Sequence, residues 1–203
     1  MAKHFSEEER AQIHDRLISV GLELFEKYGI SKTNVSDITE RVGISKGSFY
    51  AFFASKGDLF MEVYWVEREK AHAVVLAEME NGEQDLCELL RKYTEGMYEQ
   101  LKIRPILEIV YDAEALTAIS GEPARGRMYL FNEQINQQVT EMVRNWMARD
   151  GQYAIEPRVV AKMLRSINFL RFHYHAFGQE DFDTTVANLT DAVLDYIRRT
   201  KIQ

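Results

Sequence analysis

Cysteine and long apolar runs are scarce in this chain of 203 residues. Cys87 is the only cysteine, so an intramolecular disulfide is impossible and a cysteine-rich metal site is excluded. We expect its thiol to be buried and inert. No stretch approaches the roughly 18 uninterrupted apolar residues of a membrane span, and the first nine residues lack the apolar segment of a signal peptide. A cytoplasmic protein without a membrane partner is therefore predicted.

Basic charge is also in short supply, because 25 Lys and Arg residues face 32 Asp and Glu residues and leave a net charge of −7. That balance disfavours a nucleic-acid binder, whose affinity depends on neutralised phosphates. From Lys27 to Lys56, however, five basic residues against two acidic ones leave a local charge of +3. The asymmetry fits a small DNA-facing surface on an acidic protein, and it also fits an ordinary solvated face.

The first sixty residues contain four helix starts. Ser6 and Glu9 have the spacing of a capping box, and apolar residues then recur at helical spacing as far as Gly29. Polar capping residues mark the other starts, at Asn34 with Asp37, at Ser45, and at Ser55 with Asp58. The pattern predicts a compact helical domain over residues 1–60.

Residues 61–203 also carry helical periodicity. The fourth helix is expected to continue to about Met79, with Asn81 and Gly82 as its end. Further helices are predicted over 83–102, 105–120, about 123–150, 157–177 and 183–200, and the last two are apolar over broader faces than one core needs. No strand pattern or repeat is visible. The predicted fold class is all-α with about nine helices: an N-terminal three-helix helix-turn-helix domain joined by a long helix to a C-terminal helical bundle.

Residues 33–60 read as two short helices that meet at a tight turn. Gly43 stands where a left-handed backbone costs least, and Ser45 can cap the second helix. In helix-turn-helix proteins the first residues of the second helix touch base edges, so short or cationic side chains are expected there. Lys46, Gly47 and Ser48 meet that expectation.

Residues 6–65 resemble the DNA-binding domain of the TetR family of bacterial transcriptional regulators, most closely from Val42 to Tyr50, at Phe53, and at Ser55 with Lys56. The resemblance implies that residues 45–48 face the major groove and that Tyr50 and Lys56 reach phosphates. Lys46 could contact guanine or a further phosphate, and Phe49 is expected in the core. The expected DNA-binding residues are Asn34, Ser36, Ser45, Lys46, Gly47, Ser48, Tyr50 and Lys56.

The resemblance also implies a homodimer, formed through the last two helices, that binds double-stranded DNA at a palindromic operator. Residues 61–203 would then form the domain for effector binding and dimerisation. Six side chains could line a pocket for an apolar or aromatic small-molecule effector, although for each one taken singly a place in the core or the dimer contact is the more favoured interpretation. They are Tyr93, Met97, Tyr111, Phe131, Phe169 and His173.

Three functions compete at this stage. The first is a repressor released from its operator by the effector, and the second is a DNA-binding adaptor regulated by a protein partner without a small ligand. The third, a helical-bundle enzyme, would need a catalytic constellation that the sequence does not show. His173 and His175 point to different sides of a helix, and Glu69 with His72 forms a single Glu-x-x-His motif where a di-iron bundle needs two. We therefore expect no enzyme, cofactor or metal.

Overall fold

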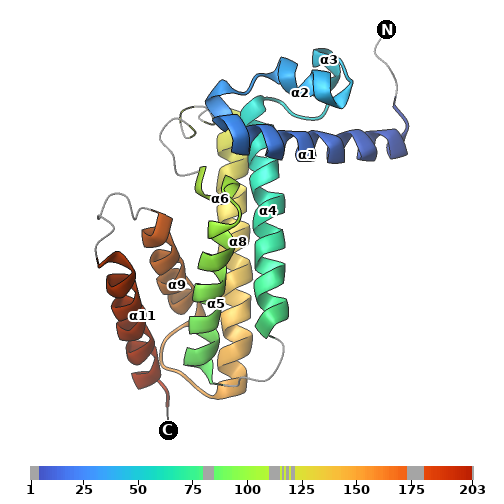
Figure 1. The fold of residues 1–203 in the computed structure, drawn as a ribbon. Coiled ribbons are helices and arrows are strands. Elements are labelled where there is room, and N and C mark those ends of the chain that lie inside the picture. The colour runs from blue at the N-terminus through green and yellow to red at the C-terminus, as the bar shows by residue number, and fades with distance from the viewer. Residues whose placement is uncertain are drawn as a thin grey trace. The chain divides into compact units, whose positions relative to one another are not determined.

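The computed structural model describes residues 5–79, 85–109, 115, 117, 119, 122–172 and 181–202. These ranges contain nine helices, one isolated bridge between Tyr153 and Lys201, and no strand (Figure 1). The predicted all-α architecture is confirmed. None of the described helices combines the length and apolarity needed to cross a bilayer.

The chain divides into two compact units. The first comprises residues 1–70 and 104–131, and the second comprises residues 71–103 and 132–203. Two long helices, α4 (Lys56–Met79) and α8 (Glu122–Asp150), contribute residues to both units. The functional boundary predicted at residue 60 stays a prediction, because it concerns roles rather than packing.

Helix α1 (Glu7–Lys32) starts where the capping pattern predicted. The Ser6 N–H donates to Glu9 Oε2 at 2.8 Å, and the Glu9 N–H donates to Ser6 Oγ at 3.1 Å. The helix kinks at Gly29, whose φ is 75°, and then continues to Lys32, three residues beyond the predicted end. Gly21 lets α1 lie close to α4, because an added Cβ would come within 3.3 Å of the Leu59 side chain.

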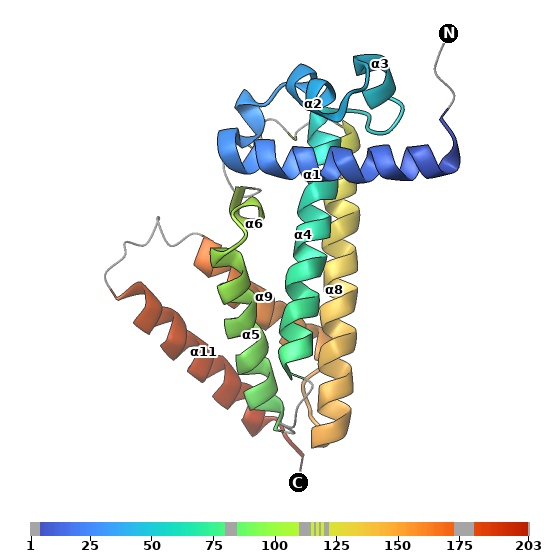
Figure 2. The same cartoon turned by 45° about the vertical axis from the view of Figure 1, so that its right-hand side comes forward.

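The remaining helices of the first unit are α2 (Val35–Val42), α3 (Lys46–Phe49) and α6 (Ile106–Ile109). Both α2 and α3 lie along one side of α1 (Figures 1 and 2). The α6 helix is a single turn near the start of the predicted 105–120 helix, and most later residues of that prediction lie outside the described residues. Its Ile106 N–H donates to Glu26 Oε1 of α1 at 3.4 Å.

The beginning of α8 is fixed to the beginning of α4. Arg127 Nε donates to Asp58 Oδ1 at 2.6 Å, and the same guanidinium pairs with Glu62. One turn further along α8, Phe131 stacks on Trp65 with ring centroids 4.5 Å apart. Because Asp58 also accepts the Ala54 N–H at 3.0 Å, the ion pair supports the turn that leads from α3 into α4.

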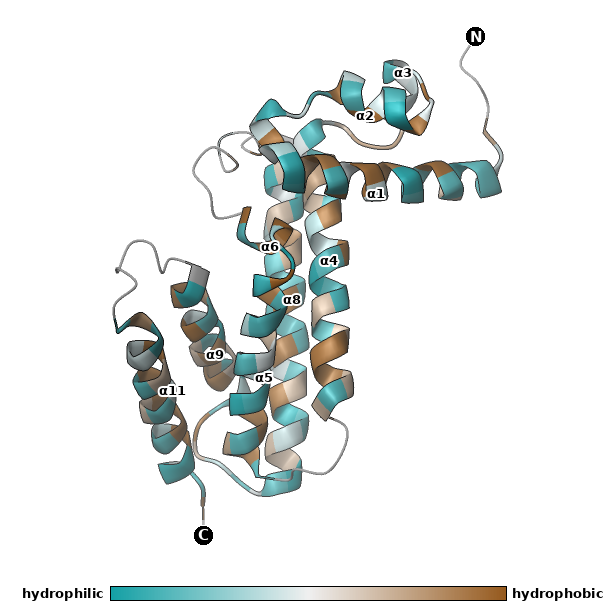
Figure 3. Ribbon diagram, viewed as in Figure 1, coloured by the Kyte–Doolittle hydropathy of each residue, from teal (hydrophilic) through white to brown (hydrophobic). Residues whose placement is uncertain are grey.

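In the second unit, α5 (Leu86–Lys102), α9 (Pro157–Phe172) and α11 (Phe182–Arg199) pack against one another. Both hydrophobic and hydrophilic residues occur along α5 and α11 (Figure 3). The α5 helix begins at Leu86 rather than at residue 83, because the Asp85 side chain accepts the Glu88 N–H at 3.0 Å and caps it. Asn81 and Gly82, and residues 173–177 of the predicted 157–177 helix, lie outside the described residues.

The C-terminal segment is tied to the turn between α8 and α9. The Ala154 N–H donates to the Thr200 carbonyl at 2.8 Å, and Lys201 Nζ donates to Asp150 Oδ2 at 2.7 Å. Cys87 of α5 is buried as predicted, and its thiol donates to the Leu194 carbonyl at 3.5 Å. Burial raises the pKa of this thiol, which fits an inert cysteine.

Candidate nucleic-acid interface

The turn between α2 and α3 is formed by local capping interactions. The Asn34 N–H donates to Asp37 Oδ2 at 3.1 Å at the start of α2, and buried Ile38 and Val42 anchor the helix. Gly43 ends α2 in the left-handed conformation, with φ 78° and ψ 35°, and its N–H donates to the Thr39 carbonyl at 2.9 Å. The predicted helix end at Gly43 is confirmed.

Helix α3 is held at its start and from beneath. The Ser48 N–H donates to Ser45 Oγ at 3.0 Å, so Ser45 is the predicted N-cap. Phe49 is fully buried, as expected, and its ring lies 6.0 Å from that of Phe53. A four-residue helix is thereby fixed in position although it has little intrinsic stability of its own.

The outer face of α3 is open to solvent. Lys46 and Gly47 are exposed, Ser48 is half-buried, and Tyr50 is 56% exposed. Among the described residues the Lys46 ammonium makes no hydrogen bond and no ion pair. A Cβ added at Gly47 would have only Ser45 Oγ within 4 Å, at 3.8 Å. This face can therefore contact a partner without any rearrangement of α3.

Lys56 has protein partners that the sequence did not reveal. Its Nζ donates to the Thr33 carbonyl at 2.7 Å and to the Ser31 carbonyl at 3.4 Å, both at the end of α1. Partial burial lowers the pKa of this ammonium. An ammonium has three N–H donors, so one remains for a phosphate, and the expected phosphate contact stays a prediction.

Other polar residues near this face differ in how far they are engaged. Asn34 is exposed and Ser36 is half-buried. Arg41 forms an ion pair with Glu23, which offsets part of the local positive charge counted from the sequence. The most accessible cation in the turn and α3 is therefore Lys46.

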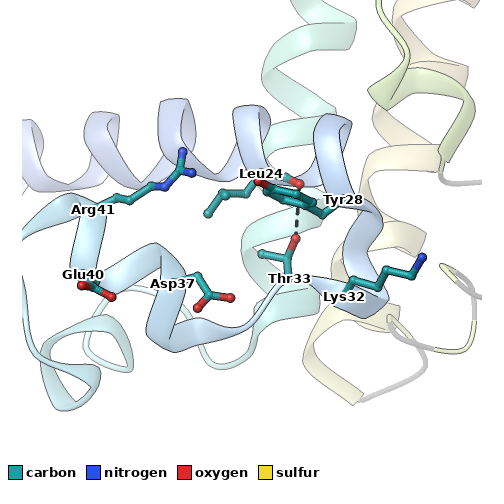
Figure 4. A pocket seen from close by; sticks show the side chains of 7 residues that line it. All are labelled: Leu24, Tyr28, Lys32, Thr33, Asp37, Glu40 and Arg41. Carbon is teal, nitrogen blue, oxygen red and sulfur yellow. Dashed lines mark hydrogen bonds between the residues drawn. The ribbon is translucent and has the colours of Figure 1, made fainter.

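A hollow of about 500 Å³ opens between the end of α1 and α2 (Figure 4). The Thr33 hydroxyl, in its lining, lies 2.8 Å from the Gly29 carbonyl and 3.3 Å from the Leu24 carbonyl, and it can donate to either. Acidic and basic side chains both line the hollow, so its lining favours neither an anion nor an apolar ligand. The lining residues are Leu24, Tyr28, Lys32, Thr33, Asp37, Glu40 and Arg41.

The expected effector-lining residues are only partly brought together. Tyr93 and Met97 are buried one turn apart on α5, and the Tyr93 ring meets Trp146 at 6.0 Å. Phe131 belongs to the first unit, where it stacks on Trp65, and Phe169 on α9 is 50% exposed. Tyr111 and His173 lie outside the described residues. Whether these side chains line a pocket stays a prediction.

Arg171 is a buried side chain that the sequence reasoning missed. It is 9% exposed on α9, donates from Nη1 to the Thr94 carbonyl at 3.0 Å, and lies 4.4 Å from the centre of the Tyr98 ring. Burial lowers the pKa of its guanidinium. The available signal was its position, since it continues the buried stripe of Val160, Leu164 and Ile167 at helical spacing.

The described residues contain no group of three or more His, Cys, Asp or Glu side chains that could hold a metal ion. Glu69, half of the Glu-x-x-His motif, accepts a hydrogen bond from Arg68 Nη1 at 2.6 Å. This carboxylate therefore acts as an ion-pair partner in the structure.

Comparison with known proteins places this site in a family. Residues 17–63 match the model of bacterial regulatory proteins of the tetR family. The HTH-type transcriptional regulator AcrR of Shigella flexneri is 24% identical over 110 residues, which are 52% of this chain and 51% of that protein. A protein of Escherichia coli K12 named "Probable acrEF/envCD operon repressor" is 28% identical over 116 residues, 55% of this chain and 52% of that protein.

The chain thus matches about half the length of these two relatives. A solved TetR-family transcriptional regulator of Pectobacterium atrosepticum shares the fold with a TM-score of 0.67 at 18% identity, over 98% of this chain and 99% of that one. The match covers the helix-turn-helix, and the likeness in fold extends over the rest. Residues 17–63 therefore carry the helix-turn-helix of the tetR family of bacterial regulatory proteins, and the chain shares its fold with a solved TetR-family regulator.

Proposed function

We propose that this chain is a DNA-binding transcriptional regulator whose α3 enters the major groove of duplex DNA. The observation that carries the proposal is the first turn of α3, which Phe49 holds from beneath while Lys46 and Gly47 face outward. This is the end of the second helix that reads base edges in helix-turn-helix proteins. The names of the relatives, a transcriptional regulator and an operon repressor, support a role in transcription.

Each polar group at this face has a distinct role in the proposal. Lys46 donates to guanine acceptors or to a phosphate, and Ser45 and Ser48 supply short polar groups beside it. The Tyr50 hydroxyl and the third Lys56 N–H donate to phosphates, which position the protein and carry no sequence information. Asn34 and Ser36 are the expected contacts from the start of α2.

The proposed active form is a homodimer that reads a palindromic operator. Leu189 and Tyr196 are exposed apolar residues two helical turns apart on α11, while Val186, Leu194 and Ile197 of the same helix are buried in the second unit. The helix thus has exposed apolar residues besides those it buries in its own unit, which supports a four-helix bundle made of α9 and α11 from two copies. A two-fold dimer would place its two α3 helices on half-sites about 34 Å apart or a multiple of that spacing.

The proposed regulation is repression that a small apolar or aromatic effector relieves. The effector must bind the DNA-free form more tightly than the DNA-bound form. Tyr93 and Met97 offer a buried aromatic and a thioether on α5 for such a ligand. Both α4 and α8 run from the second unit into the first, where Arg127 pairs with Asp58, so a shift of either helix can reach α3.

One observation favours the alternative, a DNA-binding adaptor controlled by a protein partner. Tyr129 and Leu130 are adjacent apolar residues on α8, and both are largely exposed. Large exposed apolar residues that adjoin one another are typical of protein contact sites. A thermal-shift screen separates the two forms of regulation: an effector-controlled protein is stabilised by a ligand that also releases DNA, and an adaptor is not.

Selection of bound DNA from a random duplex pool tests the proposal, and we expect enrichment of a palindrome. Fluorescence anisotropy titrations at several salt concentrations then compare Lys46→Ala, Ser48→Ala and Lys56→Ala, with exposed Lys92→Ala on α5 as the control. Lys56→Ala should weaken binding to every sequence and lower the salt slope by about 1. Lys46→Ala and Ser48→Ala should change the preferred sequence.

Two results contradict the proposal. One is a pool from which no sequence is enriched at low ionic strength. The other is an equal, sequence-independent loss of affinity in all three α3 and α4 variants. Thermal denaturation of each variant is measured in parallel, because Lys56 also bonds the end of α1 and its loss can weaken the fold.

A further inference from the structure

Arg171 differs from the other buried charged side chains of the described residues. Asp58 pairs with Arg127 at 2.6 Å, Arg68 with Glu69 at 2.6 Å, and Glu67 with Lys70 at 2.6 Å. Within the described ranges Arg171 forms no ion pair with any carboxylate. A buried charge without a counterion is costly, so its presence requires an explanation.

The contacts of Arg171 leave most of its donors unused. A guanidinium carries five N–H donors, and among the described residues only Nη1 is engaged, with the Thr94 carbonyl at 3.0 Å. The Tyr98 ring covers one face of the group. Glu95, Glu99 and Asp183 are near enough to attract the charge, but none is among its bonded partners. The guanidinium can therefore accept an additional anionic partner.

A second unsatisfied group lies one turn earlier on the same helix face. Asn168 Oδ1 is buried and has no hydrogen-bond partner among the described residues, and residues three apart on a helix are neighbours. Ile167, next to Asn168 in sequence, belongs to a buried apolar cluster with Phe182 and Val186. The end of α9 thus combines a cation and an amide with nearby apolar packing.

From this juxtaposition we propose that Arg171 and Asn168 bind the acidic head group of an apolar organic acid, and that this acid is the effector. Arginine matches a carboxylate with two parallel N–H donors, and the Asn168 amide can bond a further polar atom of the head group. The assignment of the acid as effector rests on the proposed regulatory function. The binding of the acid does not depend on DNA and is tested without it.

The first experiment measures thermal denaturation of the full chain without ligand. Arg171→Met removes a buried charge that bonds no carboxylate of the described residues, so the melting temperature should stay level or rise by about 2–4 °C. The matched control is Arg127→Met, which leaves Asp58 and Glu62 without their partner and should lower the melting temperature by at least that amount. If both variants are destabilised equally, Arg171 is a structural residue and the proposal is overturned.

The second experiment is calorimetric titration of the full chain with decanoate and benzoate, each compared with its neutral counterpart, decan-1-ol and benzyl alcohol. At least one carboxylate should bind about tenfold more tightly than its alcohol, as a charged hydrogen bond predicts. Arg171→Met should abolish that preference, and Arg171→Lys should retain part of it. Wild-type protein that binds neither acid better than its alcohol, or an Arg171→Met variant that binds like wild type, overturns the proposal.

The two proposals fail in different measurements. If an acid binds in a way that depends on Arg171 but never releases DNA, the binding site is supported and its role as the effector site is refuted. A protein that binds the acid and no DNA at all contradicts the regulatory function alone.

Discussion

Gly47→Ala separates what α3 needs for folding from what it needs for DNA. Gly47 is the second residue of α3, its backbone is outside the left-handed region, and an added Cβ meets only Ser45 Oγ at 3.8 Å. The fold therefore leaves room for a methyl group. Alanine favours a helix by up to about 1 kcal/mol over glycine, so the variant should unfold about 2–4 °C higher.

The same methyl group should weaken DNA binding. Gly47 lies on the exposed face of α3 beside Lys46, and the proposed orientation directs that face into the groove. If the backbone of α3 approaches a base edge closely, the methyl group costs about 1–3 kcal/mol, the range for one disrupted base contact. This corresponds to a loss of affinity of roughly ten- to hundredfold.

Circular dichroism melting and fluorescence anisotropy on one preparation measure both effects together. Gly43→Ala is the matched control, because its φ of 78° strains any residue with a Cβ and should cost about 1–2 kcal/mol of stability. Two outcomes refute the reasoning. A lower melting temperature for Gly47→Ala would show that the space is not free, and unchanged affinity would show that α3 does not approach DNA closely.

Two further predictions concern the second unit. Leu189→Glu combined with Tyr196→Glu should convert the dimer to a monomer and reduce operator affinity; light scattering that still shows a dimer would contradict the assignment of α11. Burial alone would raise the pKa of Asp150, but hydrogen bonds from Lys201 and Tyr153 outweigh it and lower the pKa. Because the pKa of this carboxyl is lower in the folded state than in the unfolded state, where it is near 4, the ionised carboxylate stabilises the fold above about pH 4. This stabilisation is lost as the pH falls through the folded-state pKa. Asp150→Asn should thus cost about 1–2 kcal/mol at pH 7, and denaturant titrations should show little difference below about pH 3.

The sequence predicted those parts of the structure that neighbouring residues determine. The Ser6–Glu9 capping box, the N-cap at Ser45 and the left-handed Gly43 each depend on residues within a few positions. Such signals are readable because the bond and its partner share one helical turn. The helix-turn-helix and its exposed Lys46 follow from them.

Contacts between distant segments were not readable in the same way. Lys56 bonds a carbonyl 23 positions away at Thr33, and Arg127 pairs with Asp58 at a separation of 69 residues. The sequence gives each residue type and its helix face, but partner choice depends on how the helices pack. The sequence therefore predicts a phosphate contact for Lys56 but does not reveal the two carbonyls that already accept from its ammonium.

Buried charged residues show most clearly that the sequence does not give the partner of a side chain. Asp58 and Arg171 are both buried charged residues on helices, and the sequence analysis identified neither as buried. Packing distinguishes them, because Asp58 meets Arg127 while the described residues offer Arg171 a carbonyl and an aromatic ring. A paired buried charge holds two helices together, whereas an unpaired one costs stability until an anion arrives. The second kind is therefore where an effector can add binding energy that the folded chain lacks.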